Sequence, residues 1–293
     1  MRELQLKWGI KRSITGFDGE EEAAVRSVDM KAMVAELVGT AMLCVVGCGA
    51  AMAYGPTDGP TRLVVAFAFG LSVLAIAYSM GHHSGGHLNP AVTLSLVLGS
   101  AVPWYQGLAN FLAQIIGSLL GAALLCAIYP CEADLTTNLA SNMPSAGYTD
   151  AQAVLAEAMG TFLLCFTVWE SAVSPVSTCG RNACIAISGA VFVSVLTLLP
   201  VTGCSINPAR SFGPAIMASL RGCPNYTGGG LEALWIMFVG PFLGAASATL
   251  AHHGFIPQPV KEGEDRTSSM NSMGFEIDNK KEGITIHPRV MDL

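Results

Sequence analysis

Two stretches of the sequence decide the fold: Gly85-Gly86-His87-Leu88-Asn89-Pro90-Ala91 and Gly203-Cys204-Ser205-Ile206-Asn207-Pro208-Ala209-Arg210. Each follows a long apolar run and opens a shorter one, about half the roughly 20 residues that a helix needs to cross a hydrocarbon core. A helix that begins at either Asn-Pro-Ala triplet therefore enters a membrane and ends inside it. We expect two such re-entrant half-helices, near 89–99 and 207–218.

Both Asn-Pro-Ala triplets consist of residue types that start a helix. Asn is a favoured N-cap because its side-chain oxygen accepts an N–H of the first turn. Pro fits the first helical position, where its missing N–H is not needed. With its oxygen held in this way, the Asn amide N–H₂ becomes a fixed donor that points outward. The half-helix behind it adds the positive end of a dipole of roughly half a charge.

The composition is that of a membrane protein with several spans. Of the 293 residues, 52% are hydrophobic and 12% are charged, which is about half the usual share of charge in soluble proteins. No Lys, Arg, Asp or Glu occurs from Leu63 to Cys131 or from Asn182 to Ala209. The sequence predicts six spans, near 32–54, 62–80, 104–129, 152–173, 183–202 and 232–253. The first follows a charged stretch of about 30 residues and is not expected to be a cleavable signal peptide.

The charges outside these spans predict the orientation of the chain. Loop 130–150 contains acids but no Lys or Arg, whereas both tails carry several. The positive-inside rule places the tails in the cytoplasm and this loop outside. We therefore expect a cytoplasmic tail at 1–31, a membrane domain at 32–254 and a disordered cytoplasmic tail at 255–293. The plasma membrane is the favoured location, with an internal membrane as the alternative.

An internal repeat relates the two halves of the membrane domain. Ala35-Glu36-Leu37-Val38-Gly39-Thr40 matches Ala156-Glu157-Ala158-Met159-Gly160-Thr161. The Asn-Pro-Ala triplets also match, as do Gly-containing segments at 117–121 and 240–244. Because three spans per half is an odd number, the second repeat (151–254) must be inverted relative to the first (32–130). The half-helices then enter from opposite faces and point their N-termini at each other.

The nine cysteines form no disulfide framework in this interpretation. Most lie in or beside apolar runs, where Cys is a small core residue, and no metal-ligand spacing occurs. A disulfide between Cys131 and Cys223 is the alternative if both loops are external; we favour free thiols. We predict no metal, no cofactor and no nucleic-acid partner. No catalytic residues are predicted, because the chain lacks a nucleophile–base pair and a phosphate loop.

From about residue 30 to 254, the chain resembles the aquaporins, or major intrinsic proteins. The markers are the two Asn-Pro-Ala boxes, the Ala-Glu-x-x-Gly-Thr opening of each half, and the continuation Arg210-Ser211-Phe212-Gly213-Pro214. The resemblance implies an all-α membrane protein with six transmembrane helices and two re-entrant half-helices in a right-handed bundle. It also implies one pore per subunit and a homotetramer surrounded by membrane lipid.

The resemblance places Phe69, Val195, Cys204 and Arg210 around the narrowest point of the pore, as a selectivity filter. Water channels of the family usually carry His where Val195 stands. Glycerol channels carry Trp, Gly, an aromatic residue and Arg, a set that this chain lacks. Arg210 is permanently charged, so it would repel cations and donate to a passing oxygen. Without His the ring is slightly wider and more apolar, which favours some leak of hydrogen peroxide, ammonia or urea.

Further residues complete the expected pore. At the midplane Asn89 and Asn207 would both donate to one water molecule and break the chain along which a proton could hop. A ladder of backbone carbonyls would face an apolar wall. The ladder is expected to consist of Gly85, Gly86, His87, Leu88, Gly203, Cys204, Ser205 and Ile206.

Glu36 and Glu157 are intramembrane acids, which by default suggest a proton relay. In the family, the matching acids bind the backbone of the re-entrant loops, and we favour that bracing role for both residues.

The favoured function is a passive channel for water that excludes protons and ions. The alternatives are a broader, glycerol-type channel, a proton-coupled transporter built from inverted repeats and broken helices, and a non-conducting structural protein. The transporter is disfavoured because no titratable pair is expected at the midplane. The sequence also leaves open pH gating by His82 or His83, glycosylation of Asn225, and phosphorylation at 267–269.

Overall fold

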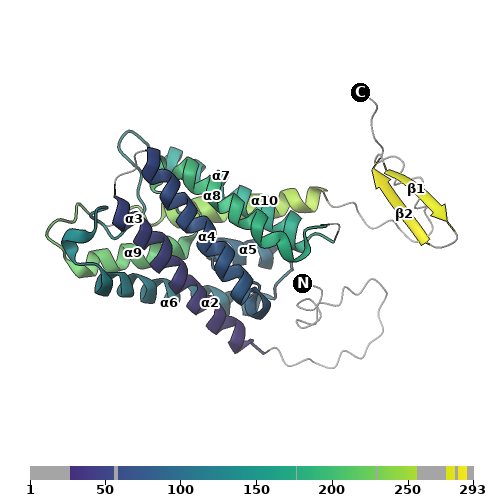
Figure 1. Ribbon diagram of the computed structural model, residues 1–293, viewed down its shortest axis with the longest axis horizontal. Coiled ribbons are helices and arrows are strands. Elements are labelled where there is room, and N and C mark those ends of the chain that lie inside the picture. Colours follow the sequence, from purple (N-terminus) through teal and green to yellow (C-terminus); the bar gives the residue numbers. More distant parts are fainter. Residues whose placement is uncertain are drawn as a thin grey trace. The chain divides into compact units, whose positions relative to one another are not determined.

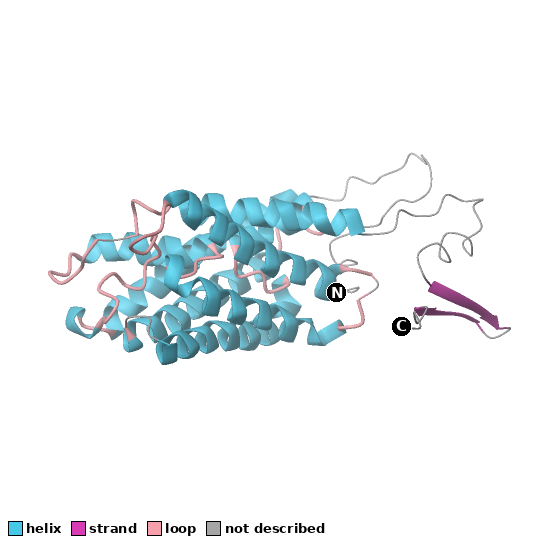
Figure 2. Ribbon diagram, turned by 90° about the horizontal axis from the view of Figure 1, so that it is seen from above, coloured by secondary structure: helices cyan, strands magenta, loops and turns pink. Residues whose placement is uncertain are grey.

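The computed structural model describes residues 27–55, 59–175, 177–228, 230–255, 275–280 and 283–288. It divides into two compact units, Met1–His253 and Gly254–Leu293. The first unit is a bundle whose long helices run side by side along its length (Figures 1 and 2). The long helical segments are α2 (Met30–Leu43) continued by a π-helical turn (Cys44–Cys48) and α3 (Gly49–Tyr54), α4 (Gly59–Ser84), α6 (Trp104–Ile128), α7 (Asp150–Val168) continued by a second π-helical turn (Trp169–Val173), α8 (Ala183–Thr202) and α10 (Ile236–Phe255).

These segments correspond to the six predicted spans. Among the described residues, five are long and apolar enough to cross a membrane: Met30–Tyr54, Gly59–Ser84, Trp104–Ile128, Asp150–Val173 and Ala183–Thr202. The sixth, α10, has 20 residues and carries His252 and His253 in its last turn, which makes it less apolar. Its predicted start at 232 is wrong, because residues 231–235 form turns.

Two shorter helices, α5 (Pro90–Leu98) and α9 (Pro208–Arg221), are the half-helices. With 9 and 14 residues, neither reaches the roughly 20 needed for a full crossing. α5 packs against α6 and α7, while α9 packs against α6. Short 3₁₀ turns at Cys131–Ala133 and Gly180–Asn182 complete the helical elements of this unit.

Glycines set the closest helix crossings, and they do so in the same way in both halves. A Cβ on Gly117 of α6 would lie 2.2 Å from the carbonyl oxygen of Leu37 in α2. A Cβ on Gly244 of α10 would lie 2.2 Å from the carbonyl oxygen of Ala158 in α7. Only glycine allows backbones to approach so closely, which is how helices pack where lipid removes any hydrophobic gain between them.

The preference for free thiols is wrong at two positions. Cys131 and Cys223 form a disulfide with Cα atoms 5.7 Å apart. They are separated by 92 residues in the sequence. They meet because α6 packs on α9, which brings the segments after both helices together. Local spacing carries no signal of such a pairing. The other seven cysteines are free: Cys44, Cys48, Cys126, Cys165, Cys179, Cys184 and Cys204.

The second unit contains an antiparallel hairpin of β1 (Phe275–Lys280) and β2 (Gly283–Pro288), with Ile277 opposite Ile286. The expectation of disorder is therefore wrong for these two segments. Apolar residues alternate along both, at 275, 277, 284 and 286, and this period of two is typical of strands. Residues 1–26, 256–274, 281–282 and 289–293 of the two tails, including the candidate phosphorylation residues 267–269, lie outside the described residues.

Candidate functional site

The two half-helices begin as their sequences predict. Asn89 caps α5 with its Oδ1, which accepts the Ala91 N–H at 2.8 Å. Asn207 caps α9, and its Oδ1 accepts the N–H groups of Ala209 at 3.0 Å and Arg210 at 3.3 Å. Pro90 and Pro208 occupy the first helical positions. This capping leaves both side-chain amides as donors.

The two caps are also joined to each other, which the sequence did not indicate. Asn89 Nδ2 donates to the carbonyl oxygen of Ile206 at 2.7 Å, and Asn207 Nδ2 donates to that of Leu88 at 2.8 Å. Each amide has two N–H donors. One is used in this crossed pair, and the other remains for a ligand. The carbonyls of Leu88 and Ile206, expected in the ladder, thus already accept one hydrogen bond each.

The loops before the caps have an unusual backbone that is the same in both halves. The first has positive φ at Gly85 (92°), Gly86 (65°) and Leu88 (54°). The second has positive φ at the matching positions Gly203 (77°), Cys204 (52°) and Ile206 (44°). Left-handed backbone costs a non-glycine residue about 1–2 kcal/mol. Such a conformation persists only where the surroundings hold it.

Glu36 holds the first loop. Its side chain is fully buried. Oε1 accepts the His87 N–H at 2.9 Å and the Ser84 hydroxyl at 2.6 Å. Oε2 accepts the Leu88 N–H at 2.6 Å and Gln114 Nε2 at 2.7 Å. The carboxylate thus binds two consecutive backbone N–H groups directly before Asn89, in hydrogen bonds strengthened by its charge.

Glu157 has the same arrangement in the second loop. It is also fully buried. Oε1 accepts the Thr202 hydroxyl at 2.5 Å and the Ser205 N–H at 2.8 Å, and Oε2 accepts the Ile206 N–H at 2.6 Å. Both acids therefore have the geometry that a bracing role requires.

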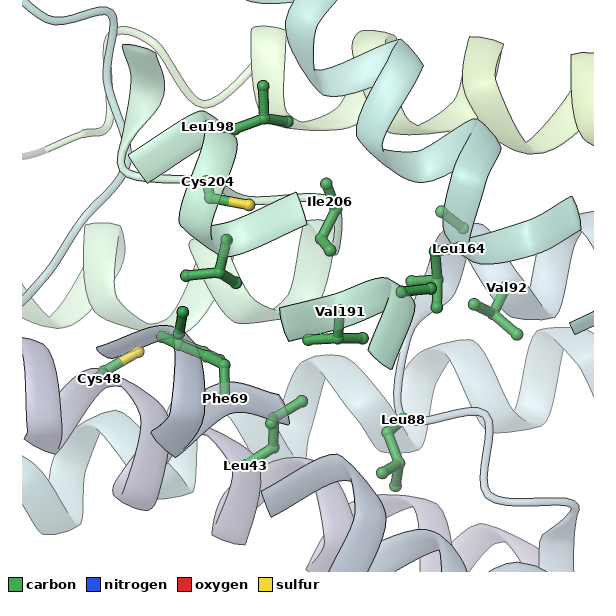
Figure 3. Packing of buried hydrophobic residues seen from close by; sticks show 14 of the residues in the cluster. Leu43, Cys48, Phe69, Leu88, Val92, Leu164, Val191, Leu198, Cys204 and Ile206 are labelled. Carbon is green, nitrogen blue, oxygen red and sulfur yellow. The ribbon is translucent and has the colours of Figure 1, made fainter. Parts of the chain in front are cut away.

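Two of the four predicted filter residues, Arg210 and Phe69, lie against each other, and the other two are buried. Phe69 of α4, Val195 of α8 and Cys204 of the second loop belong to one buried cluster, in which Figure 3 labels Phe69 and Cys204. Arg210 of α9 is 3% exposed, and its Cζ lies 5.0 Å from the centroid of the Phe69 ring. Gly47 makes room for this ring, since a Cβ there would lie 2.3 Å from it.

Arg210 has one protein partner that the sequence did not indicate. Its Nη1 donates to the carbonyl oxygen of Ala140 at 2.8 Å. Ala140 lies in loop 130–150, which the sequence marks only as acidic and external. In the described part of the chain, Arg210 Nε is buried without a hydrogen-bond partner. The guanidinium is thus held through Nη1, and its Nε–H group remains able to donate a hydrogen bond.

Other predicted residues lie apart from this constriction. His82 and His83 are exposed at the end of α4, with their ring centroids 3.8 Å apart. His87 is instead buried, and its Nδ1 lies 3.1 Å from Thr93 Oγ1. Within the described ranges, no group of three or more His, Cys, Asp or Glu side chains could hold a metal ion.

Comparisons with known proteins agree with this geometry. A family model described as "Major intrinsic protein" matches residues 23–252. Aquaporin-5 of Ovis aries is 35% identical over 223 residues, which cover 76% of this chain and 80% of the relative. Aquaporin-1 of Homo sapiens is 32% identical over 249 residues, covering 83% and 88%. The solved aquaglyceroporin from Plasmodium falciparum has a TM-score of 0.66 at 19% identity, covering 77% of this chain and 96% of that chain, and shows the shared fold alone.

Proposed function

The chain belongs to the major intrinsic protein family of membrane channels, and from this premise we propose that it is a passive channel for water that excludes protons and ions. The observation that carries the proposal is the pair of facing caps. Asn89 and Asn207 are tied to each other and retain one amide N–H each. The relatives are channels rather than enzymes, and we propose no catalytic role.

The two amide donors at the midplane favour water transport over proton transport. A water oxygen that accepts from both amides has its own hydrogens directed away, toward the two ends of the pore. Its neighbours on both sides must then accept from it, so hydrogen bonds cannot run in one direction through this point. The facing positive ends of α5 and α9 add an electrostatic barrier to any cation, including hydronium.

The constriction adds a second barrier. The Arg210 guanidinium is always charged and repels cations. Its unpartnered Nε supports a role as a donor to the oxygen of a passing solute. Phe69, Val195 and Cys204 contribute no charged group. Because Val195 supplies no donor opposite Arg210, we also propose a slow leak of hydrogen peroxide, ammonia or urea. Because the ring is also wider with Val195 than with His, a broader, glycerol-type channel is the second candidate function.

For the assembly, we propose a homotetramer in the plasma membrane with both termini in the cytoplasm. The disulfide between Cys131 and Cys223 supports the external position of both loops, since disulfides persist in oxidising compartments. A stripe of half-exposed side chains on α6 supports contact with lipid or a neighbouring subunit; it consists of Leu108, Leu112, Ile116, Leu120 and Leu124.

Stopped-flow light scattering on proteoliposomes tests this function, with water and glycerol measured in parallel. We expect fast water efflux with a low activation energy and slow glycerol entry. A mercurial should block the flow through Cys204, and Cys204→Ser should conduct water without being blocked. Glycerol entry as fast as water would establish the second candidate. No flux of either solute would contradict both.

A further inference from the structure

The loop that contacts Arg210 has its own strained backbone. Thr137, Leu139 and Ala140 have φ of 56°, 57° and 53°. Three non-glycine residues in the left-handed region within four positions are costly, so other contacts must hold the loop in this shape. In this conformation the Ala140 carbonyl oxygen points at the Arg210 guanidinium and accepts its hydrogen bond.

Asp134 supplies the contacts that hold the loop. Its side chain is buried, with 1% of its surface exposed. Oδ1 accepts the backbone N–H of Thr136 at 3.0 Å and the Thr136 hydroxyl at 2.5 Å. Oδ2 accepts the Leu139 N–H at 2.7 Å. Thr136 Oγ1 in turn accepts the Ala140 N–H at 2.9 Å. Hydrogen bonds thus run from Asp134 through Thr136 to Ala140, and from the Ala140 carbonyl to Arg210.

The ends of this loop are fixed to the half-helix that carries Arg210. The disulfide joins Cys131, three residues before Asp134, to Cys223, just after α9. Arg221, the last residue of α9, donates to the carbonyl oxygens of Cys126 and Tyr129 at the end of α6. The loop is therefore attached to the end of α9. Because the Ala140 carbonyl is held in place, it also holds the Arg210 guanidinium in place.

We propose that Asp134 is a positioning residue for selectivity. Through Thr136 and Ala140 its carboxylate sets where the Arg210 guanidinium stands, and thereby the width and donor geometry of the constriction. Asp134 does not touch the solute. This inference rests on the proposed function, because it takes Arg210 to be the cation of the filter.

The test compares Asp134→Asn with Asp150→Asn in full-length protein in proteoliposomes. Both variants remove one negative charge between α6 and α7, but Asp150 is exposed at the first position of α7. In Asp134→Asn one acceptor oxygen becomes an N–H₂ donor facing backbone N–H groups. We expect the urea-to-water permeability ratio to rise by about three- to tenfold, the size expected from the net contribution of one ordinary hydrogen bond. Asp150→Asn should keep the wild-type ratio.

The Arg210→Val background separates positioning from general damage. A merely structural role of Asp134 would lower both permeabilities in proportion and leave the ratio unchanged, which would overturn the proposal. If Asp134 acts through Arg210, Asp134→Asn should not change the ratio when Arg210 is already Val. An equal rise of the ratio in both backgrounds would also overturn the proposal.

A readout without flux keeps this test separate from that of the channel function. Mass spectrometry follows the rate at which a small methanethiosulfonate reagent modifies Cys204, beside Arg210 in the constriction. We expect Asp134→Asn to raise this rate at least about threefold, and Asp150→Asn to leave it unchanged. An unchanged modification rate in Asp134→Asn would overturn the inference, whether or not the wild type conducts water. Absence of water flux in the wild type would contradict only the proposed function.

Discussion

The first re-entrant loop and the second have matching backbones but different side-chain chemistry. In both, left-handed residues stand four, three and one positions before the Asn cap. In both, a buried Glu binds the two N–H groups that precede the cap. Three positions after the cap, however, the first half has Val92 and the second has Arg210. The shared backbone builds the two half-helices, and the difference places a permanent positive charge in the second half at the position where the first has Val92.

A second pair of contacts shows the same relation. His87 Nδ1 lies 3.1 Å from Thr93 Oγ1, and in the matching positions Ser205 Oγ lies 2.6 Å from Ser211 Oγ. The first pair is completed by Gln114 of α6, whose Nε2 donates to Thr93 at 2.9 Å. The second is completed by a residue of loop 130–150, because Ser211 donates to Asn142 Oδ1 at 2.8 Å. In the described part of the chain, this loop thus contacts the second half at both Ser211 and Arg210.

The largest expected effect separates the two bracing acids. Glu157→Gln replaces an acceptor oxygen by a donor next to two backbone N–H groups, and an unpaired buried group costs about 1–3 kcal/mol. Glu36→Gln should destabilise the protein less, because Gln114 Oε1 has no partner among the described residues. After a flip of the Gln114 amide, this oxygen can accept a hydrogen bond from the new N–H₂ group. We expect Glu157→Gln to lower the free energy of unfolding by about 3 kcal/mol and Glu36→Gln by about half as much.

Thermal unfolding of both variants in detergent measures this difference. Size-exclusion chromatography before each scan ensures that folded protein is compared. Equal destabilisation in the two variants, or a greater loss in Glu36→Gln, would show that the free acceptor of Gln114 does not matter.

The next effect comes from making the two halves alike with Arg210→Val, which copies Val92. Removing the permanent cation and its donors should increase urea and glycerol permeability about tenfold, which corresponds to about 1.4 kcal/mol in the barrier. Water permeability should remain within about twofold, since the paired Asn caps are intact. Flux assays for water, urea and glycerol, with a pH dye inside the vesicles to detect protons, measure the change. Unchanged solute entry would place the constriction elsewhere.

The next effect, on stability rather than on flux, is expected from opening the Cys131–Cys223 disulfide with Cys131→Ser and Cys223→Ser together. A cross-link over this separation stabilises by about 4 kcal/mol in soluble chains. Here the membrane restricts the unfolded chain as well, so we expect a loss of about 1–2 kcal/mol. Thermal unfolding with and without a reductant tests this, because only the wild type should respond to reduction. A wild type insensitive to reductant would contradict the contribution of this bond.

The smallest expected effect is that of Val195→His, which restores the residue typical of the family's water channels. The imidazole adds a donor opposite Arg210 and narrows the ring. Urea and peroxide entry should fall by about threefold, with water flux changed by less than about twofold. Isotope uptake and a peroxide-sensitive dye report the two solutes. If the variant and the wild type leak equally, Val195 does not control these permeants.

Much of the membrane domain could be predicted because its determinants are local. An Asn oxygen reaches the N–H groups two and three residues onward, so the caps of α5 and α9 follow from Asn-Pro-Ala alone. The length of an apolar run decides between a span and a half-helix. The hairpin at 275–288 is equally local, but its four alternating apolar residues lie in a polar tail whose overall composition predicts disorder.

The sequence alone therefore predicts the set of helices, their inverted repeat and the residue types at the expected filter positions. The tertiary structure alone decided how these parts are held. The crossed Asn bonds join residues 117 and 119 positions apart, and the Arg210–Ala140 bond spans 70. Such contacts arise only when the two halves pack face to face and loop 130–150 folds over α9. The spacing of these residues along the chain does not predict the contacts, because residues so far apart are brought together only by the packing of the helices and loops between them.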